Sequence, residues 1–239
     1  MSSPADIRGA VPLLLTVNAG YVDTAGFLAL QGLFTAHVTG NFVTFGATIV
    51  QGTSGVVAKL LALPVFCLVI LLTRTLAHRL LSPERLVLES AIVLKTLLLG
   101  CGAAFAIAWG PFANGDAPTA LVTGMTLVAA MAIQNAASRI HLADSPPSTI
   151  MTGTSTQIMI DIADLGSGNL TPEARAVVLV RLRKMCLAVA TFALGCAVAA
   201  LIFIQFGMKA FLLPPLIAAL SLIAVVLSGK DPRVSTQPS

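Results

Sequence analysis

Long apolar runs without charges recur along the whole chain and are separated by short charged turns. A helix that spans a bilayer needs about 20 mainly apolar residues. Six segments approach or reach this length: residues 11–30, 56–72, 86–109, 118–137, 185–206 and 210–227. Two shorter segments, residues 35–50 and 148–165, mix polar with apolar positions. The pattern predicts an all-α integral membrane protein with about six transmembrane helices.

Lysine and arginine, which are enriched in cytoplasmic loops, indicate the side on which each turn lies. If all eight segments cross from an inside N-terminus marked by Arg8, the basic turn at residues 74–85 lies outside, against this tendency. If residues 35–50 instead enter and leave from one side, that turn moves inside. The same treatment of residues 148–165 keeps the basic residues 175–184 inside. Six spans plus two re-entrant segments therefore fit the charges best, and ordinary crossings by the short segments stay open as the alternative.

This topology divides the single membrane domain, residues 1–239, into two halves of the same order. Residues 11–113 form the first structural repeat, residues 114–229 form the second, and residues 230–239 are a cytoplasmic tail. Each half has a span, a re-entrant segment and two further spans. An odd number of crossings inserts the second half upside down, and inverted repeats with broken helices are a recurrent design of transporters.

Short motifs match between the two halves. An Asn-Ala pair at residues 18–19 is followed by a Thr-Gly pair at residues 39–40, and the same pairs recur at residues 135–136 and 152–153. Two shared dipeptides can arise by chance, but both sets lie at a predicted re-entrant segment. The motifs therefore support the inverted repeat.

The first re-entrant segment is unusual for an apolar region. It reads GLFTAHVTGNFVTFG over residues 32–46 and contains His37, Thr39, Gly40 and Asn41. Non-helical backbone is tolerated at membrane depth only where protein buries it or where it lines a water-filled cavity. A half-helix that begins there directs free N–H groups at a ligand and favours an anion or a dipole. Alternatively, these side chains only cap and pack the hairpin.

Asp23 lies well inside the first apolar run, where a carboxylate costs roughly 2.5–3.5 kcal/mol on insertion scales. Such residues usually face the bundle interior and mark pathways for ions or substrates. Asn18 and Tyr21 share a helical face, whereas Asp23 is turned away from them unless a glycine distorts the helix. Two interpretations stay open: Asp23 lines a polar pathway, or it caps a broken helix through Thr24 and its neighbours.

Other polar residues have a functional and a structural interpretation. His37 could serve proton coupling, although a hydrogen-bonded structural histidine is more common. Gln134 and Asn135 lie just ahead of the second re-entrant segment, and Thr152, Gly153 and Thr154 lie at its start. We expect Asp161 and Asp164 to lie at a solvated end of that segment. Lys95 is too deep in its span to reach water completely, and it does not share a helical face with Glu89.

Composition excludes several functional classes. The mean hydropathy is +0.93, and the net charge of +4 arises mostly near helix ends, so it indicates topology rather than nucleic-acid binding. The four cysteines are scattered singly in apolar segments, without the spacing of metal ligands, and we expect them to be small buried hydrophobic residues. No phosphate-binding loop, dinucleotide fingerprint or hydrolase motif is found. We therefore expect no cofactor, no metal and no enzymatic activity.

The sequence resembles a known family in three blocks: GYVDTAGFLAL with LFTAHVTGNFV, then AIQNAASR, then IMTGTSTQIMID. These blocks are similar to those of the YoaK-like family of bacterial inner-membrane proteins, a domain of unknown function. The resemblance covers roughly residues 11–227. It implies about six spans in a bacterial cytoplasmic membrane and brings no established substrate.

The leading hypothesis is a small secondary transporter or channel for a small polar or anionic solute, with both termini cytoplasmic. Its site would lie between the two re-entrant segments. The candidate residues are Asn18, Tyr21, Asp23, His37, Thr39, Gly40, Asn41, Gln134, Asn135, Thr152, Gly153 and Thr154. A non-transporting accessory or scaffold protein is the second hypothesis, and a membrane-embedded enzyme is the third. The expected partners are the lipid bilayer and the solute, and a homo-oligomer stays open.

Overall fold

The computed structural model describes residues 4–80, 84–142, 145–149 and 151–228, so the predicted tail at residues 230–239 lies outside the described residues. These parts of the chain are helical and contain no strand. The elements in chain order are α1 (Pro4–Ala29), η1 (Val38–Gly40), α2 (Asn41–Gln51), α3 (Val56–Leu80), α4 (Glu84–Trp109), α5 (Pro118–His141), α6 (Met151–Ser167), α7 (Pro172–Phe206), η2 (Gly207–Leu212) and α8 (Leu213–Ser228). The prediction of an all-α architecture is confirmed.

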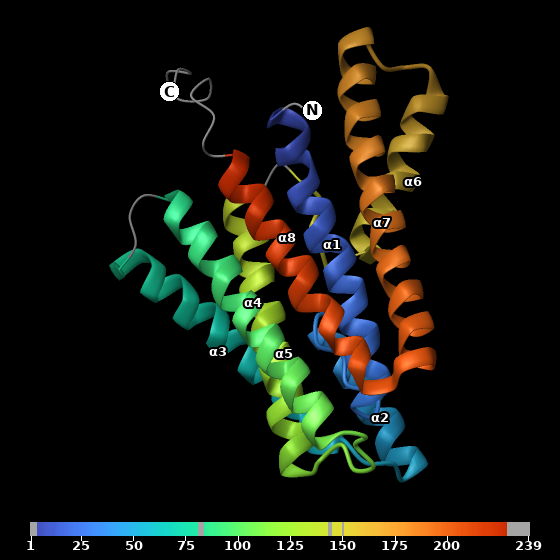
Figure 1. Ribbon diagram of the computed structural model, residues 1–239. Helices are drawn as coiled ribbons and strands as arrows, with labels where there is room; N and C mark the ends of the chain where they lie inside the picture. The colour runs from blue at the N-terminus through green and yellow to red at the C-terminus, as the bar shows by residue number, and fades with distance from the viewer. Residues whose placement is uncertain (1–3, 81–83, 143–144, 150, 229–239) are drawn as a thin grey trace.

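The helices run between two ends of one elongated bundle (Figure 1). The N-terminal end holds the start of α1 and the end of α8, and the Trp109 end holds the end of α4. Helix α1 runs toward the Trp109 end, where α2 lies, and α3 returns toward the N-terminal end. Helix α5 runs in the opposite direction to α1, and α6 lies at the N-terminal end. The two short helices therefore lie at opposite ends of the bundle.

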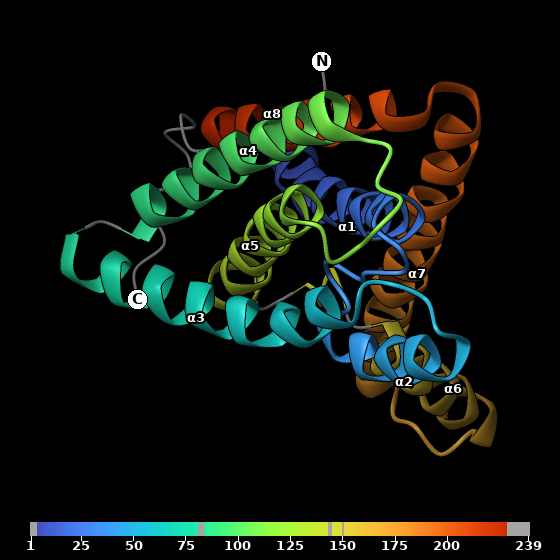
Figure 2. The same ribbon diagram turned by 90° about the horizontal axis from the view of Figure 1, so that it is seen from below.

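Equivalent helices of the two halves have equivalent packing partners. Helix α1 packs on α7 and α8, and α5, its counterpart, packs on α3 and α4. Within each half the short helix packs on the following one, α2 on α3 and α6 on α7, and the fourth helices, α4 and α8, pack on each other. Viewed along the bundle, α1 and α5 lie at the centre with the other long helices around them (Figure 2).

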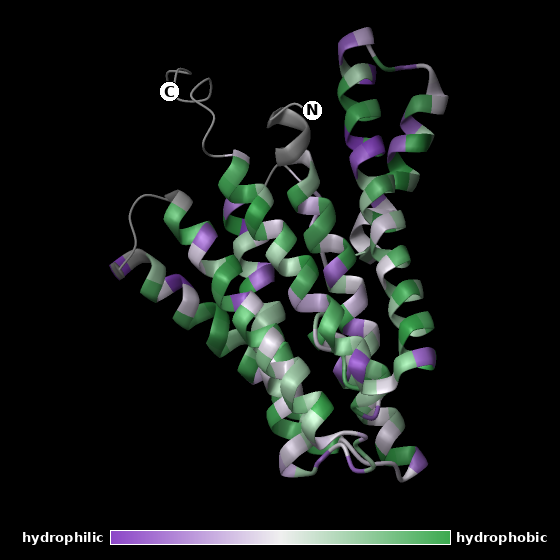
Figure 3. Cartoon of the chain, viewed as in Figure 1, coloured by the Kyte–Doolittle hydropathy of each residue, from purple (hydrophilic) through white to green (hydrophobic). Residues whose placement is uncertain are grey.

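The outer surface of the bundle is apolar, as a lipid environment requires. Large hydrophobic side chains such as Leu71, Leu194 and Leu201 are more than half exposed, and apolar residues dominate the long helices in Figure 3. Five segments are long and apolar enough to cross a membrane: Gly9–Ala29, Val56–Ala77, Leu86–Trp109, Pro118–His141 and Pro172–Ser228. The last has 57 residues and contains α7, the turn η2 and α8. The protein is an integral membrane protein.

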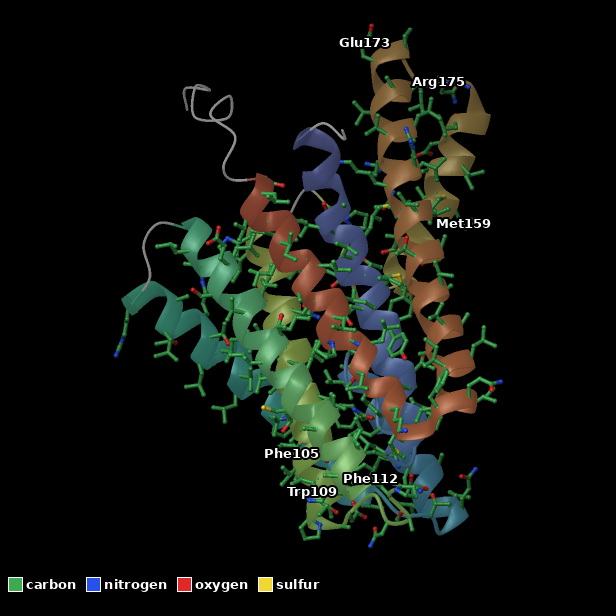
Figure 4. All side chains as sticks on the ribbon, in the orientation of Figure 1. Phe105, Trp109, Phe112, Met159, Glu173 and Arg175 are labelled. Carbon is green, nitrogen blue, oxygen red and sulfur yellow. The ribbon has the colours of Figure 1, made fainter. Side chains whose placement is uncertain are left out.

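Helix α7 begins 13 residues before the predicted span at residues 185–206, at Pro172 rather than at Met185. Its 35 residues give a length of about 52 Å at 1.5 Å per residue, more than the ~30 Å of a hydrocarbon core. The additional turns pack on α6 beyond the end of the bundle (Figure 1). Glu173 and Arg175 mark this polar extension, whereas the aromatic residues Phe105 and Trp109 lie at the opposite end (Figure 4).

An ion pair holds the α6–α7 extension together and contradicts one expectation. Asp161 is completely buried, not solvated, and its carboxylate accepts hydrogen bonds from Arg181 Nη2 at 2.6 Å and Nε at 2.9 Å. Gln157 Nε2 donates a third hydrogen bond to it at 2.8 Å. Asp161 and Arg181 lie 20 positions apart on different helices, so the sequence pattern of α6 alone does not reveal the pair.

The cysteines also differ from expectation. Three of them are exposed, Cys101 and Cys186 on helix surfaces and Cys67 in the wall of a cavity, and Cys196 is half-buried. An apolar residue faces lipid as readily as it faces the core of a membrane protein. Hydropathy therefore does not separate the two locations.

Helices α1 and α7 approach so closely that only glycine fits at their crossing. A Cβ atom at Gly20 would lie 2.3 Å from the Phe192 carbonyl oxygen, and one at Gly195 would lie 2.2 Å from the Val17 carbonyl oxygen. Small residues permit this close backbone packing in membrane helices. The contact joins the first helix of one half to the third helix of the other.

Candidate functional site

After α1 the chain turns back along the bundle in a segment without regular structure, residues 30–37, here called the first return loop. It comes back to the level of Asp23, whose Oδ1 atom accepts the backbone N–H groups of Thr35 at 2.8 Å and Ala36 at 2.7 Å. Asp23 Oδ2 lies 3.0 Å from His37 Nδ1. The carboxylate is 4% exposed, so these contacts satisfy backbone donors that have no water available.

Asn41, at the start of α2, closes the first return loop from its other side. Its side-chain amide donates to the Phe34 carbonyl oxygen and accepts from the Phe34 N–H, both at 2.8 Å. The amide thereby replaces the backbone pairing that a strand would provide. The His37 ring packs edge-on against Phe192 of α7, with ring centroids 5.7 Å apart. The loop is thus fixed by α1, α2 and α7.

A similar segment follows α5, residues 142–150, here called the second return loop, of which 142 and 145–149 are described. Asn135 Nδ2 donates to Thr149 Oγ1 at 2.7 Å, and Gln134 Nε2 donates to Ser148 Oγ at 3.2 Å. Gln134 Nε2 also donates to the Leu15 carbonyl oxygen at 2.8 Å. This loop, too, turns back to the last turns of the helix before it. Its contacts are made by amide and hydroxyl side chains.

Lys95 of α4 supports the second return loop from within the bundle. Its side chain is 1% exposed, and Nζ donates to Gln134 Oε1. Because Lys95 Nζ holds Gln134 Oε1, Gln134 Nε2 is directed at the Leu15 carbonyl oxygen and at Ser148 Oγ. This burial agrees with the expectation that Lys95 lies too deep in its span to reach water completely.

A cavity of about 560 Å³, here called the central cavity, lies where the two return loops approach the wall formed by α3. The first loop and η1 contribute Ala36, His37, Val38 and Thr39, and the second half contributes Asn135 and Thr149. Helix α3 contributes Leu63, Phe66, Cys67, Ile70, Leu71 and Arg74. The cavity therefore has an apolar wall on α3 and polar groups from both halves of the chain.

A second, smaller cavity of about 140 Å³, here called the polar cavity, lies at the end of α5. It is lined by Asn135, Ser138, Arg139, Ser145, Pro147 and Ser148. Asn135 lines both cavities, and Thr149, to which it donates a hydrogen bond, lines the central cavity. The hydroxyl oxygen of Ser138 is buried and has no hydrogen-bond partner among the described residues.

The predicted site residues fall into three groups. His37, Thr39 and Asn135 line the central cavity. Asp23, Asn41, Gln134 and Tyr21 lie behind it and hold backbone in place; the Tyr21 hydroxyl donates to the Ala210 carbonyl oxygen at 2.8 Å. Gly40 ends η1, and Thr152, Gly153 and Thr154 lie in the first turn of α6, outside the residues that line the two cavities.

Asn18 is the most unusual of the predicted residues. It is completely buried, and neither its amide nitrogen nor its amide oxygen has a hydrogen-bond partner among the described residues. A buried polar group without a partner costs about 1–3 kcal/mol. A water molecule or a polar solute at this position would remove that cost.

Two polar residues that line the central cavity, Arg74 and Thr149, were not among the predicted site residues. Arg74 was interpreted only as a topological marker of the basic turn, yet it lines the cavity. Thr149 lies two positions before the start of α6 at Met151, and nothing in its own sequence context distinguishes it. Only its place in the chain could have indicated it, because a loop that turns back along a helix must form hydrogen bonds with that helix.

Asp23 does cap backbone N–H groups, as one interpretation expected, but these groups belong to a different segment of the chain from the one expected. Asp23 caps the N–H groups of the return loop twelve and thirteen positions later, not those of Thr24 and its neighbours. A side chain that bonds across such a separation cannot be assigned from local helix signals.

Comparisons with known proteins agree with the membrane architecture. The chain is similar to the UPF0700 transmembrane protein YoaK of Bacillus subtilis (strain 168), with 29% identity over 161 residues that cover 66% of this chain and 69% of the relative. No solved structure matches the chain significantly. The family described as "Protein of unknown function (DUF1275)" matches residues 11–225. The predicted resemblance to YoaK is thus confirmed, and the chain belongs to the DUF1275 family.

Proposed function

We propose that this protein is a small secondary transporter or channel that carries a small polar or anionic solute across the bacterial inner membrane. The observation that supports this function best is the central cavity, because both halves of the chain contribute polar groups to it through their return loops. Transport sites at the junction of two repeats are commonly built from interrupted helices of this kind. The proposal is therefore one of transport rather than catalysis.

The proposed topology has six crossings and two re-entrant segments, arranged as an inverted repeat. The exchange of packing partners between α1 and α5 and between α3 and α7 supports the repeat. Arg139 at the end of α5 and Arg175 in the α7 extension favour a cytoplasmic N-terminal end. Both termini would then be cytoplasmic, and both return loops would turn back within the membrane.

Polar backbone at membrane depth also favours a solvated pathway. Thr39 is exposed in the wall of the central cavity, although residues around it are apolar. Irregular backbone within a membrane persists only where protein buries it or water reaches it. Asp23 supplies the first condition for Thr35 and Ala36, and we infer that water in the central cavity supplies the second for Thr39.

Cys67 provides a direct test of the cavity, because it lines the central cavity whereas Cys101 is exposed on α4 outside it. Two variants would each retain one of these thiols, with the other three cysteines replaced by serine. A negatively charged methanethiosulfonate reagent would be added to proteoliposomes. We expect rapid labelling of Cys67 and slow labelling of Cys101, because the reaction requires a thiolate and hence water.

Flux completes the test. Uptake of radiolabelled urea, glycerol, pyruvate and phosphate would be compared between proteoliposomes and protein-free liposomes. We expect faster uptake of at least one solute and inhibition of that uptake by labelling of Cys67, with Cys67→Ser insensitive to the reagent. Equal labelling of both thiols, or no uptake of any solute, would contradict the proposed function.

A further inference from the structure

The two cavities carry positive charge and have no carboxylate in their described lining. Arg74 lines the central cavity and Arg139 lines the polar cavity, with His37 also in the former. Asp23 does not line the central cavity. It is buried behind the first return loop and bonded to Thr35, Ala36 and His37. A solute in this pathway therefore meets guanidinium groups without a competing carboxylate.

The wall of the central cavity formed by α3 is mostly hydrocarbon, and Arg74 lies at its C-terminal end. Leu63, Phe66 and Ile70 lie along α3 and face the polar residues across the same space. An inorganic anion surrounded by water would gain nothing from such a wall. A solute with an anionic head and a short apolar body would match both sides, because apolar surface gains free energy when it leaves water.

We propose that the solute is a short-chain monocarboxylate, an inference that rests on the proposed transport function. Its carboxylate lies toward Arg74, His37 and Asn135, and its hydrocarbon part lies against the α3 wall. Guanidinium groups bind carboxylates with two parallel hydrogen bonds, which gives both charge and geometric selectivity. The volume of about 560 Å³ accommodates a molecule of a few carbon atoms together with water.

The shared position of Asn135 gives the carboxylate a route onward. Asn135 lines both cavities and donates a hydrogen bond to Thr149 of the central cavity, and we infer that this bond separates them. A carboxylate that accepts the Asn135 amide N–H in place of Thr149 opens this partition while it replaces the lost bond. On the far side Arg139 offers the next cationic group. The solute thus passes from one arginine to another through a neutral amide.

The test uses pyruvate as the flux probe, because it is almost fully ionised at neutral pH and leaks slowly through lipid. Butyrate serves as the binding probe in thermal unfolding of the detergent-purified protein, with chloride at equal ionic strength as reference. The variants are Arg74→Gln, Arg74→Lys and Arg139→Gln. The matched control is Arg79→Gln, since Arg79 is exposed on the same helix and does not line the described cavities.

We expect pyruvate uptake to exceed that of urea, glycerol and phosphate, and butyrate to raise the unfolding temperature of the wild type. Arg74→Gln should reduce pyruvate uptake by about 10-fold or more, the usual weight of a lost charge-assisted pair. Arg74→Lys should lie between the two, because the charge remains and the paired geometry is lost. Arg139→Gln should reduce uptake but leave the butyrate-induced stabilisation unchanged. Arg79→Gln should behave as wild type.

Three results would overturn the inference. Uptake of urea, glycerol or phosphate without pyruvate would exclude a monocarboxylate while the transport function stands, whereas failure of every solute would remove both. Equal losses in Arg79→Gln and Arg74→Gln would show a general effect of surface charge. Stabilisation of the wild type, but not of Arg74→Gln, by phosphatidylglycerol in place of phosphatidylcholine, with no effect of butyrate, would identify Arg74 as a site for lipid phosphate.

Discussion

The two return loops reverse the chain at opposite ends of the bundle, and they are held in different ways. The first is bonded to a buried carboxylate, Asp23, which accepts two backbone N–H groups, and it is closed again by Asn41. The second is bonded through neutral side chains, with Thr149 as an acceptor for Asn135. Charge-assisted hydrogen bonds are roughly twice as strong as neutral ones.

The contacts that hold the first return loop should therefore cost more free energy to break than those that hold the second. Loss of Asp23 would leave backbone donors buried without partners, and their desolvation is costly. Loss of the Asn135–Thr149 bond exposes both groups to cavities where water or solute can replace it. If the protein transports a solute as proposed, we expect the Asn135–Thr149 contact to change more readily than the contacts of Asp23.

The largest effect should come from Asp23→Ala. Without the carboxylate, the N–H groups of Thr35 and Ala36 lose their acceptor inside the protein, and the free energy of unfolding should fall by about 3 kcal/mol. Asp23→Asn is the control, because an amide oxygen can still accept both N–H groups; its loss should be about 1 kcal/mol. Thermal unfolding in detergent measures both. Equal losses in the two variants would show that charge, not capping, holds the first loop.

A smaller loss is expected for Asn41→Leu, which keeps a similar side-chain shape. The two hydrogen bonds to Phe34 disappear, at a cost of about 2 kcal/mol in the free energy of unfolding. Asn41→Asp retains an acceptor for the Phe34 N–H and removes only the donor. An ionised carboxylate oxygen would then face the Phe34 carbonyl oxygen in a buried site, so the stability of this variant at neutral pH should lie below that of Asn41→Leu. A stability near wild type would contradict the donation from Asn41 to Phe34.

Thr149→Val should separate stability from transport. The substitution removes the acceptor for Asn135 and keeps the volume, so the free energy of unfolding should fall by only about 1 kcal/mol. If the bond closes the passage, its loss should raise pyruvate uptake by about fivefold, the factor that 1 kcal/mol represents in an equilibrium. Ser148→Ala, at the neighbouring position of the loop, is the control. A fall in uptake with Thr149→Val would assign the bond to structure alone.

The smallest effect concerns the acid stability of the α6–α7 extension. Hydrogen bonds from Arg181 hold the pKa of Asp161 below its ordinary value. The contribution of Asp161 to stability is therefore complete above the ordinary aspartate pKa of about 4 and is lost as pH falls through the lowered value. The difference in unfolding temperature between wild type and Asp161→Asn, measured from pH 7 to pH 3, should become smaller below about pH 4. A constant difference across this range would contradict the ion pair.

Hydropathy was sufficient to predict the long helices, because a segment such as residues 86–109 has no alternative location for so many apolar side chains. The polarity of residues 32–46 also indicated that the chain is interrupted there. The sequence indicated that Asp23 needs hydrogen-bond donors but did not identify them. An intramembrane carboxylate requires donors, but nothing near it in sequence identifies Thr35 and Ala36 as those donors.

Residues that act through long-range contacts could not be predicted. Asp116, in the turn before α5, accepts the backbone N–H groups of Gly55 to Ala58 at the start of α3, some 60 positions earlier. Lys59 follows directly and is buried, with Nζ bonded to the Gln31 carbonyl oxygen at 2.7 Å and to Thr48 Oγ1 at 2.8 Å. In sequence Lys59 resembles an ordinary charge at a helix end. Its partners come from segments whose arrangement is set only when the helices pack.

The crossing of α1 and α7 also controls the orientation of an aromatic ring beside the central cavity. The backbone of Phe192 lies against Gly20 without clearance for a methyl group, and the ring of the same Phe192 packs edge-on against His37. A single methyl at position 20 would therefore push the phenyl ring and shift the imidazole that it supports. The missing methyl group at Gly20 thus fixes the position of Phe192 and, through it, the His37 ring in the wall of the central cavity.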